Sequence, residues 1–184
     1  MTELPPQLLV FYREYDPTRF RDPLGRGGRK PVGGLWTSTF HPHGEFASDW
    51  VRLHAGRHRV GVTDPRTIHA YLLHPQGDPR ILTLDSLEDA VDFQQRFASE
   101  DYRGNYPDLD VDWEKVKREF DVVHLTGNGE RLTRGSFQAN MCGWDVESAV
   151  WLHPVFRMDP YTEPLRRPKP LYEVLCPPCR ETDR

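Results

Sequence analysis

The chain has 184 residues and a mass of 21.5 kDa, which suits one domain better than two separate cores. Its 24 Lys and Arg and 28 Asp and Glu give a formal net charge of −4, which argues against a general nucleic-acid coat or a membrane-surface protein. The 14 Gly, 17 Pro and mean hydropathy of −0.70 indicate many loops, whereas 5 Trp, 7 Tyr and 9 Phe supply a core and argue against disorder throughout.

The N-terminal quarter is typical of two strands joined by a long loop. The apolar run 8–12 predicts a buried strand, and the run 33–39 predicts a second one because Trp and Thr fit a pleated surface. The segment 16–32 between them is rich in Pro, Gly and Arg, which predicts a loop. Ser48 follows a His-Pro-Gly break and is placed to cap a short helix.

Short strands and one amphipathic helix are expected in the middle of the chain. The predicted strands lie at 58–63, 68–73 and 80–84. Asp85, with Glu88 three residues later, predicts the start of a helix that ends near Ala98. The expected inner face of this helix consists of Leu87, Ala90, Val91, Gln94 and Phe97.

The last third is expected to contain one more helix and several strands. The helix is predicted over about 112–120, with Asp112 or Asp110 as its cap. Residues 128–144 are polar and glycine-bearing, which predicts a loop. The proline-rich segment 157–170 is expected to be mostly extended or irregular. The remaining predicted strands lie at 122–126, 149–153 and, at an edge, 171–175.

Together these elements predict an α+β fold. We expect a single domain over residues 1–175, made of short, mostly antiparallel strands with two or three helices and long loops. A C-terminal tail is expected at 176–184.

Cysteine usage and hydropathy predict the compartment. Cys142, Cys176 and Cys179 cannot all pair within one chain, and such a sparse, odd set favours a reducing compartment. No apolar run approaches the roughly 20 residues that span a bilayer, and the first residues lack the features of a signal peptide. We therefore expect a cytoplasmic protein with no membrane partner.

No metal site is expected. Cys176 and Cys179 form a short-spaced pair, but zinc needs two further ligands, so we interpret them as free thiols in a tail. His41, His43 and Glu45 offer three ligand types, but the proline between the histidines favours an ordinary loop.

Polar side chains lie at the ends of three predicted strands, where a rigid backbone can aim them at a cleft. Arg13 follows the first strand and offers a planar fork for a phosphate or a carboxylate. The run 37–39, Thr-Ser-Thr, brings hydroxyls on the next strand. Glu147 directly precedes a later strand, where its charge can stabilise a developing cation. His124 fits either a satisfied core histidine or a general base facing the same cleft.

An Arg on the first strand, a Trp/Ser/Thr strand and a Glu on a later strand together resemble the Arg-Ser-Glu class of mono-ADP-ribosyltransferases. The matching positions are Arg13, the run Thr37, Ser38 and Thr39, and Glu147. Asp145 stands two residues before the Glu, where many members carry Glu or Gln, and the hydroxyl run is Thr-Ser-Thr rather than Ser-Thr-Ser. The phrases 30–36 and 143–145 are also similar to uncharacterised proteins of phages and bacteria.

The resemblance implies an ADP-ribosyltransferase-like fold and an enzyme that uses NAD as its substrate to modify a protein or a nucleic acid. It implies that Arg13 holds the NAD phosphates or ribose and that Thr37, Ser38 and Thr39 shape the nicotinamide site. Trp36 would then pack on the nicotinamide. Glu147 would bind the nicotinamide ribose and stabilise an oxocarbenium-like transition state, and Asp145 would position the acceptor.

Other interpretations of the same residues remain open. Arg13 can pair with a surface carboxylate, the hydroxyls can be ordinary strand residues, and Trp36 and Trp144 can be core aromatics. The chain would then be a non-catalytic module that binds a nucleic acid or a protein through the basic loop 26–30. The two hypotheses differ in whether Arg13, Ser38 and Glu147 line one cleft.

Overall fold

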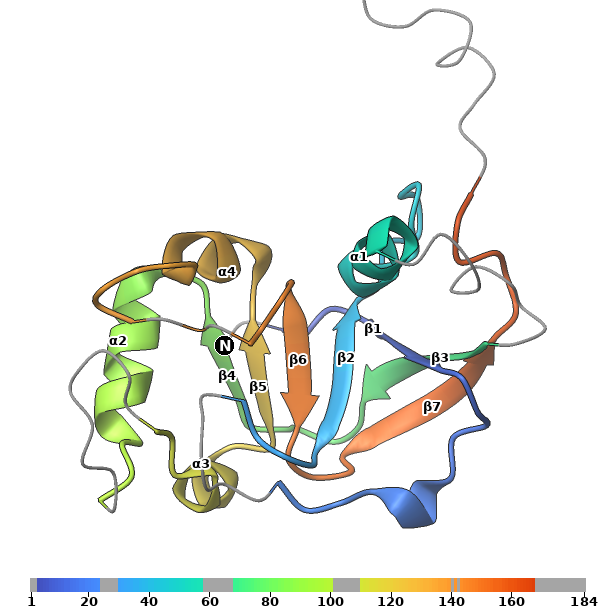
Figure 1. Ribbon diagram of the computed structural model, residues 1–184. Helices are drawn as coiled ribbons and strands as arrows, with labels where there is room; N and C mark the ends of the chain where they lie inside the picture. Colours follow the sequence, from blue (N-terminus) through green and yellow to red (C-terminus); the bar gives the residue numbers. More distant parts are fainter. Residues whose placement is uncertain are drawn as a thin grey trace, which may run out of the picture.

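The computed structural model of the chain describes residues 3–23, 30–57, 68–100, 110–139, 141 and 143–167. Across these residues it contains an open seven-stranded sheet, in the order β4-β5-β6-β2-β1-β3-β7, and four α-helices (Figure 1). Neighbouring strands are antiparallel except for the parallel pair β4 and β5. The predicted α+β fold with mostly antiparallel strands is therefore confirmed, whereas the prediction of two or three helices is wrong.

The bounds of the elements are as follows. The strands are β1 Gln7–Phe11, β2 Leu35–Thr39, β3 His69–Pro75, β4 Ile81–Leu84, β5 Val122–Leu125, β6 Ser148–Trp151 and β7 Phe156–Tyr161. The α-helices are α1 Asp49–Arg57, α2 Leu87–Arg96, α3 Trp113–Glu119 and α4 Gly127–Thr133, with a 3₁₀ turn at Pro17–Arg19. Every predicted strand that falls within the described residues has a counterpart here. The predicted strands at 58–63 and 171–175 and the tail at 176–184 lie outside them.

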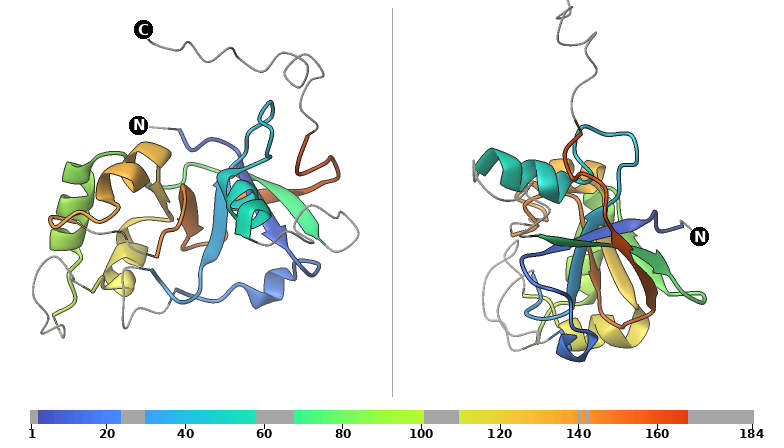
Figure 2. Two further views of the ribbon diagram at one scale, coloured as in Figure 1. Left: turned by 45° about the horizontal axis from the view of Figure 1, so that its top comes forward. Right: turned by 90° about the vertical axis from the view of Figure 1, so that its right-hand side faces the viewer.

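The helices gather at two places along the sheet. α2 and α4 lie side by side beyond β4 and β5, and α1 lies over β2 and β1 (Figures 1 and 2). Ser48 caps α1 as predicted, since its Oγ accepts a hydrogen bond from the Val51 amide at 3.3 Å. Among the described residues, no helix has the length and apolar character needed to cross a membrane.

Alternation along the strands builds separate apolar clusters. Leu8 packs with Val51 of α1, whereas its neighbour Leu9 belongs to the cluster around Trp151 on the other side. The largest cluster joins α2 and α3 to the sheet through Phe93, Phe97 and Trp113. Trp113 and Trp151 are both 0% exposed. The central strands are thereby fixed from both faces.

Strand register determines which side chains meet in the middle of the sheet. Ala149 of β6 lies opposite Thr37 of β2 on one side and opposite His124 of β5 on the other. Residues two positions apart share a face of a sheet, so Glu147 lies on the same face as Ala149. Its side chain can therefore reach the end of β2 on one side and β5 on the other.

Two local predictions need correction. The segment 128–144, predicted as a loop, contains most of α4, which is capped by the Thr126 hydroxyl. α2 is capped by Ser86 in a capping box with Asp89, not by Asp85 with Glu88. The proline-rich segment 157–170, expected to be mostly extended or irregular, is extended at its start, where the edge strand β7 tolerates Pro160.

The glycines that suggested a loop have a packing reason in α4. A Cβ placed on Gly129 would lie 2.1 Å from the Leu84 carbonyl oxygen, so the helix can approach β4 only with glycine at this position. A Cβ on Gly127 would meet nothing closer than the Glu147 Cβ at 4.0 Å.

Gly129→Ala is therefore expected to destabilise the protein by about 2 kcal/mol through overpacking, although alanine is the better helix former. Gly127→Ala is the matched control and is expected to be neutral or stabilising by up to about 1 kcal/mol. Urea denaturation of the two variants measures the difference. Equal stability of the two variants would contradict the close approach of α4 to β4.

Candidate functional site

The centre of the candidate site is the carboxylate of Glu147, which is 6% exposed. Its Oε2 accepts hydrogen bonds from the Ser38 hydroxyl at 2.9 Å and from the Thr39 amide at 2.8 Å. Its Oε1 accepts one from the Thr39 hydroxyl at 2.7 Å and lies 2.7 Å from Nε2 of His124. A buried carboxylate is thus held by the ends of β2 on one side and by β5 on the other.

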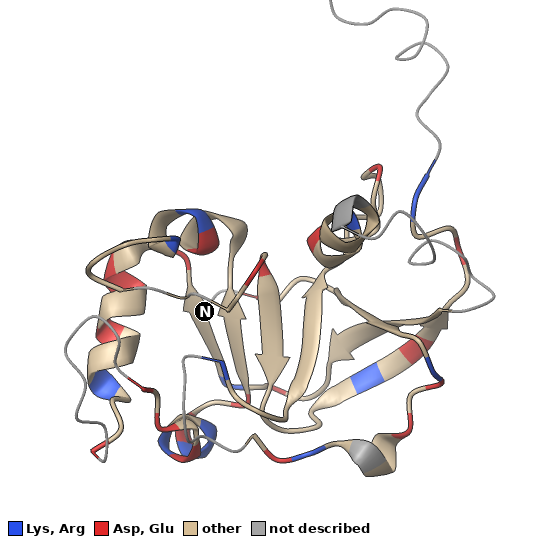
Figure 3. Cartoon of the chain, viewed as in Figure 1, with Lys and Arg blue, Asp and Glu red and all other residues tan. Residues whose placement is uncertain are grey.

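This arrangement keeps Glu147 ionised. Burial would raise the pKa of the Glu147 carboxyl, but the hydrogen bond and the charge of His124 and the two bonds from Thr39 outweigh it and lower the pKa below its ordinary value. β2, β5 and β6 themselves carry no Lys, Arg, Asp or Glu. Charged positions instead gather on the helices, the loops and the edge strand β7 (Figure 3). The negative charge of Glu147 therefore stands buried beside strands that carry no Lys, Arg, Asp or Glu, where it acts strongly on nearby charge.

A chain of hydrogen bonds extends from this carboxylate through the sheet. Gln7, which is 0% exposed, donates from Nε2 to the Thr39 hydroxyl at 3.2 Å and accepts at Oε1 from the Thr37 hydroxyl at 3.0 Å. The Thr37 hydroxyl in turn accepts a hydrogen bond from the Trp151 indole at 3.0 Å. Thr37 and Thr39 are thus both hydrogen-bonded within the sheet.

Sequence reasoning missed Gln7. The available signal was a glutamine at the start of an apolar strand, two residues before a buried leucine. A glutamine buried at that position needs hydrogen-bond partners for its side-chain amide.

A groove of about 350 Å³ runs beside the carboxylate, between β1, β2, α1 and the segment that leads into β6. Its polar and aromatic lining includes Tyr12, Lys30, Trp36, Ser38, Trp50, His54 and Asp145. The edge of the Trp36 ring meets Trp144, with 4.7 Å between ring centroids. Glu147 does not line the groove itself. It is linked to the groove through Ser38, which lines the groove and donates a hydrogen bond to Glu147.

Lys30 supplies a cation to this groove. Its Nζ lies 4.3 Å from the centroid of the Trp36 ring. Partial loss of water lowers the pKa of the Lys30 ammonium, and the charge of Asp145 partly opposes this. Asp145 is exposed and also lines the groove. An anionic ligand can therefore meet a positive group beside an aromatic face.

Arg13 is separated from the carboxylate. It is exposed and follows the end of β1, whereas Ser38 pairs with Leu8 nearer the start of that strand. Of its neighbours, Phe11 and Tyr12 line the groove and Arg13 does not. The structure therefore brings together Ser38, Thr39 and Glu147 and leaves Arg13 beyond the rim. The positions 26–29 of the basic loop lie outside the described residues, as do the three cysteines.

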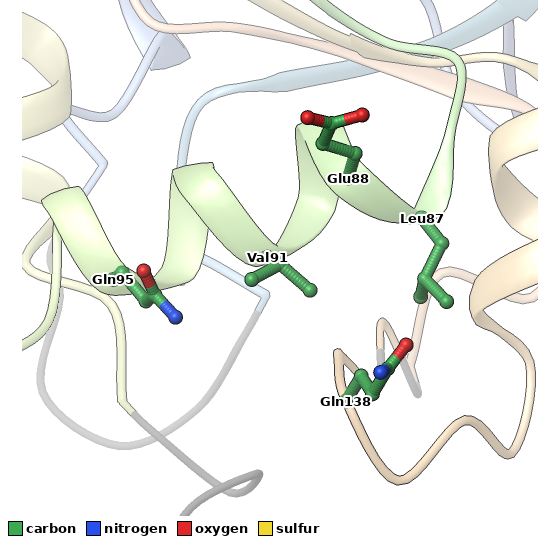
Figure 4. Close-up of a pocket in the computed structure, with 5 residues that line it drawn as sticks. All are labelled: Leu87, Glu88, Val91, Gln95 and Gln138. Carbon is green, nitrogen blue, oxygen red and sulfur yellow. The ribbon is translucent and has the colours of Figure 1, made fainter.

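Other hollows carry less chemistry. An open depression of about 670 Å³ on α2 is lined by Leu87, Glu88, Val91, Gln95 and Gln138 (Figure 4). In Figure 4 these side chains stand apart and share no polar centre. Another, of about 700 Å³, lies near β3 and β4 and includes none of the residues around Glu147.

No group of three candidate metal ligands occurs within the described parts of the chain. In the segment 41–45, His41 lies 3.8 Å from Asp49, and Glu45 pairs with Arg166 at 3.1 Å. The carboxylates there are thus engaged within the protein.

Comparisons of the chain with protein-family models, with curated proteins and with solved structures gave no match.

Proposed function

We propose that this protein is an NAD-dependent ADP-ribosyltransferase that modifies a protein or a nucleic acid. The observation that carries the proposal is the buried, ionised Glu147 bonded to Ser38 at the wall of an aromatic groove. The sheet order also supports it for two of the three matched motifs, because β2, which bears Ser38, is the direct neighbour of β6, which begins after Glu147. Residues of this kind far apart in sequence are rarely neighbours by chance.

The groove has the lining that a dinucleotide needs. Its volume of about 350 Å³ lies within the range of small-molecule sites. Trp36 and Trp50 place aromatic surface in the groove wall for a nicotinamide or an adenine ring, and Lys30 offers a positive charge for a phosphate. One face of Trp36 carries the Lys30 ammonium, and Trp50 packs on His54 with ring centroids 3.9 Å apart. Arg13, which follows the groove residue Tyr12, is assigned to a phosphate that extends past the rim.

The chemistry follows from the position of the negative charge. When the bond between nicotinamide and the ribose breaks, its electron pair leaves with the nicotinamide nitrogen and positive charge develops on the ribose. Glu147 stabilises this charge, and a ribose hydroxyl that enters at Ser38 takes over the hydrogen bond to Oε2. The acceptor then attacks the ribose carbon and gives up a proton, for which Asp145 is the nearest exposed carboxylate in the groove wall.

The experiment is incubation with NAD labelled in its adenylate part, together with protein and nucleic-acid acceptors. We expect nicotinamide release and label transfer to one class of acceptor. Release without transfer would identify an NAD hydrolase and would contradict the transferase assignment. Absence of both, with no NAD binding by calorimetry, would overturn the proposal.

A further inference from the structure

His124 contacts the Glu147 carboxylate from a different strand than the other partners do. It lies in β5 and is 6% exposed, with its Nε2 2.7 Å from Oε1 of Glu147. A carboxylate only accepts hydrogen bonds, so Nε2 carries the proton in this contact. Ser38 and Thr39, by contrast, both belong to β2.

Among the described residues, His124 is also the one titratable side chain that contacts Glu147. The contacts from β2 come from two hydroxyls and a backbone amide, which are neutral. The titratable groups on the other surrounding elements are engaged elsewhere or exposed. Asp85 after β4 accepts a hydrogen bond from Thr126, Glu130 of α4 pairs with Arg134, and Asp145 lies on the exposed groove wall. Within the described residues, the side-chain contact to Glu147 from outside β2 is therefore made by the His124 ring.

The two oxygens of the Glu147 carboxylate have different partners. Ser38 lines the groove, so its hydrogen bond to Oε2 is the one that an entering ligand can replace. Oε1 is held by the Thr39 hydroxyl and by His124. Because Thr39 is itself held by Gln7, rotation of the carboxylate is limited from β1, β2 and β5 together.

We propose that His124 is a positioning residue that locks Oε1 of Glu147, so that Oε2 stays directed toward Ser38 and the groove. The catalytic consequence of this role rests on the proposed function. The contact between His124 and Glu147 is independent of it. Removing the Nε2–H donor would leave the buried carboxylate with one hydrogen bond fewer, and such a group is protonated more easily.

The test compares His124→Leu, which has no donor, with His124→Gln, whose amide nitrogen reaches the same place as Nε2. The first readout needs no activity: the titration of the Glu147 carboxyl carbon, followed by NMR in protein labelled at glutamate and assigned with Glu147→Gln. We expect the midpoint to rise by about one pH unit or more in His124→Leu and to return toward the wild-type value in His124→Gln. Should His124→Leu fail to fold, His124→Asn, whose amide is too short to reach, takes its place.

The second readout is the pH profile of nicotinamide release. We expect its acidic limb to move to higher pH in His124→Leu and to be restored in His124→Gln. A Glu147 titration that is the same in wild type and His124→Leu would overturn the positioning role. If the titration shifts as expected but wild type neither binds nor cleaves NAD, the proposed function fails and the role of His124 toward Glu147 stands.

Discussion

Glu147→Gln is expected to lower the rate of nicotinamide release by about 10²- to 10³-fold, because it removes the negative charge that faces the developing cation. The amide has nearly the same size and shape as the carboxylate, so the loss reports on charge rather than on volume. Activity measured at saturating NAD separates the rate from binding. Glu114→Gln, on the exposed face of α3, is the matched control and is expected to leave the rate unchanged.

The same substitution has a cost in stability that has to be measured beside the activity. The Thr39 amide and the His124 ring both donate to Glu147, and an amide group at that position turns one of these contacts into donor against donor. An unpaired buried donor costs about 1–3 kcal/mol. The variant should therefore be assayed well below its unfolding temperature. A folded Glu147→Gln protein with wild-type activity would rule out the charge-stabilising role.

The sign of the pH dependence follows from the lowered pKa of Glu147. The unfolded chain binds a proton at this group near pH 4.3, and the folded protein binds it only at lower pH. Ionised Glu147 therefore stabilises the fold above about pH 4.3, and this contribution is lost as the pH falls through the folded pKa. In denaturation curves at pH 7 and pH 4, wild type should lose more stability on acidification than Glu147→Gln does.

Gln7→Ala is expected to destabilise the protein by about 3 kcal/mol. Gln7 makes hydrogen bonds to the Pro5 carbonyl, to Thr39 and to Thr37, each worth about 1 kcal/mol net, and its removal leaves a void at a position that is 0% exposed. Urea denaturation with Gln95→Ala, an exposed change on α2, as the control measures the effect. A loss below about 1 kcal/mol would mean that water or a shifted hydroxyl replaces the side chain.

Local patterns in the sequence were enough to predict most of the strands and three of the four α-helices within the described residues. The apolar runs at β1, β5 and β6 are short and continuous, and such runs mark buried strands wherever they stand in the sheet. α4 escaped because two glycines look like a loop locally, and only the distance to Leu84 across the fold explains Gly129. β7 was predicted only as part of an extended or irregular segment, because prolines are tolerated in an edge strand and the whole sheet decides which strand lies at the edge.

The candidate site divides in the same way. Ser38 and Glu147 were both predicted from the sequence as site residues, and the structure adds that their side chains are hydrogen-bonded. Gln7 was not found, because a single glutamine has no local pattern, and its partners come from β2 through strand register. For His124 the sequence left two interpretations open, since the side of the strand it faces depends on which strands flank β5.

The hydrogen-bond chain through the sheet also sets the order in which the site can assemble. Ser38 and Glu147 are 109 residues apart, and Thr37 and Trp151 are 114 apart, so these contacts close long loops whose entropy is lost before the contacts form. During synthesis from the N-terminus, β1 and β2 emerge with the hydroxyls and Gln7 but without an acceptor for Thr39. The hydrogen bonds around the Glu147 carboxylate therefore form late, when β6 enters between β5 and β2 and joins the two halves of the sheet.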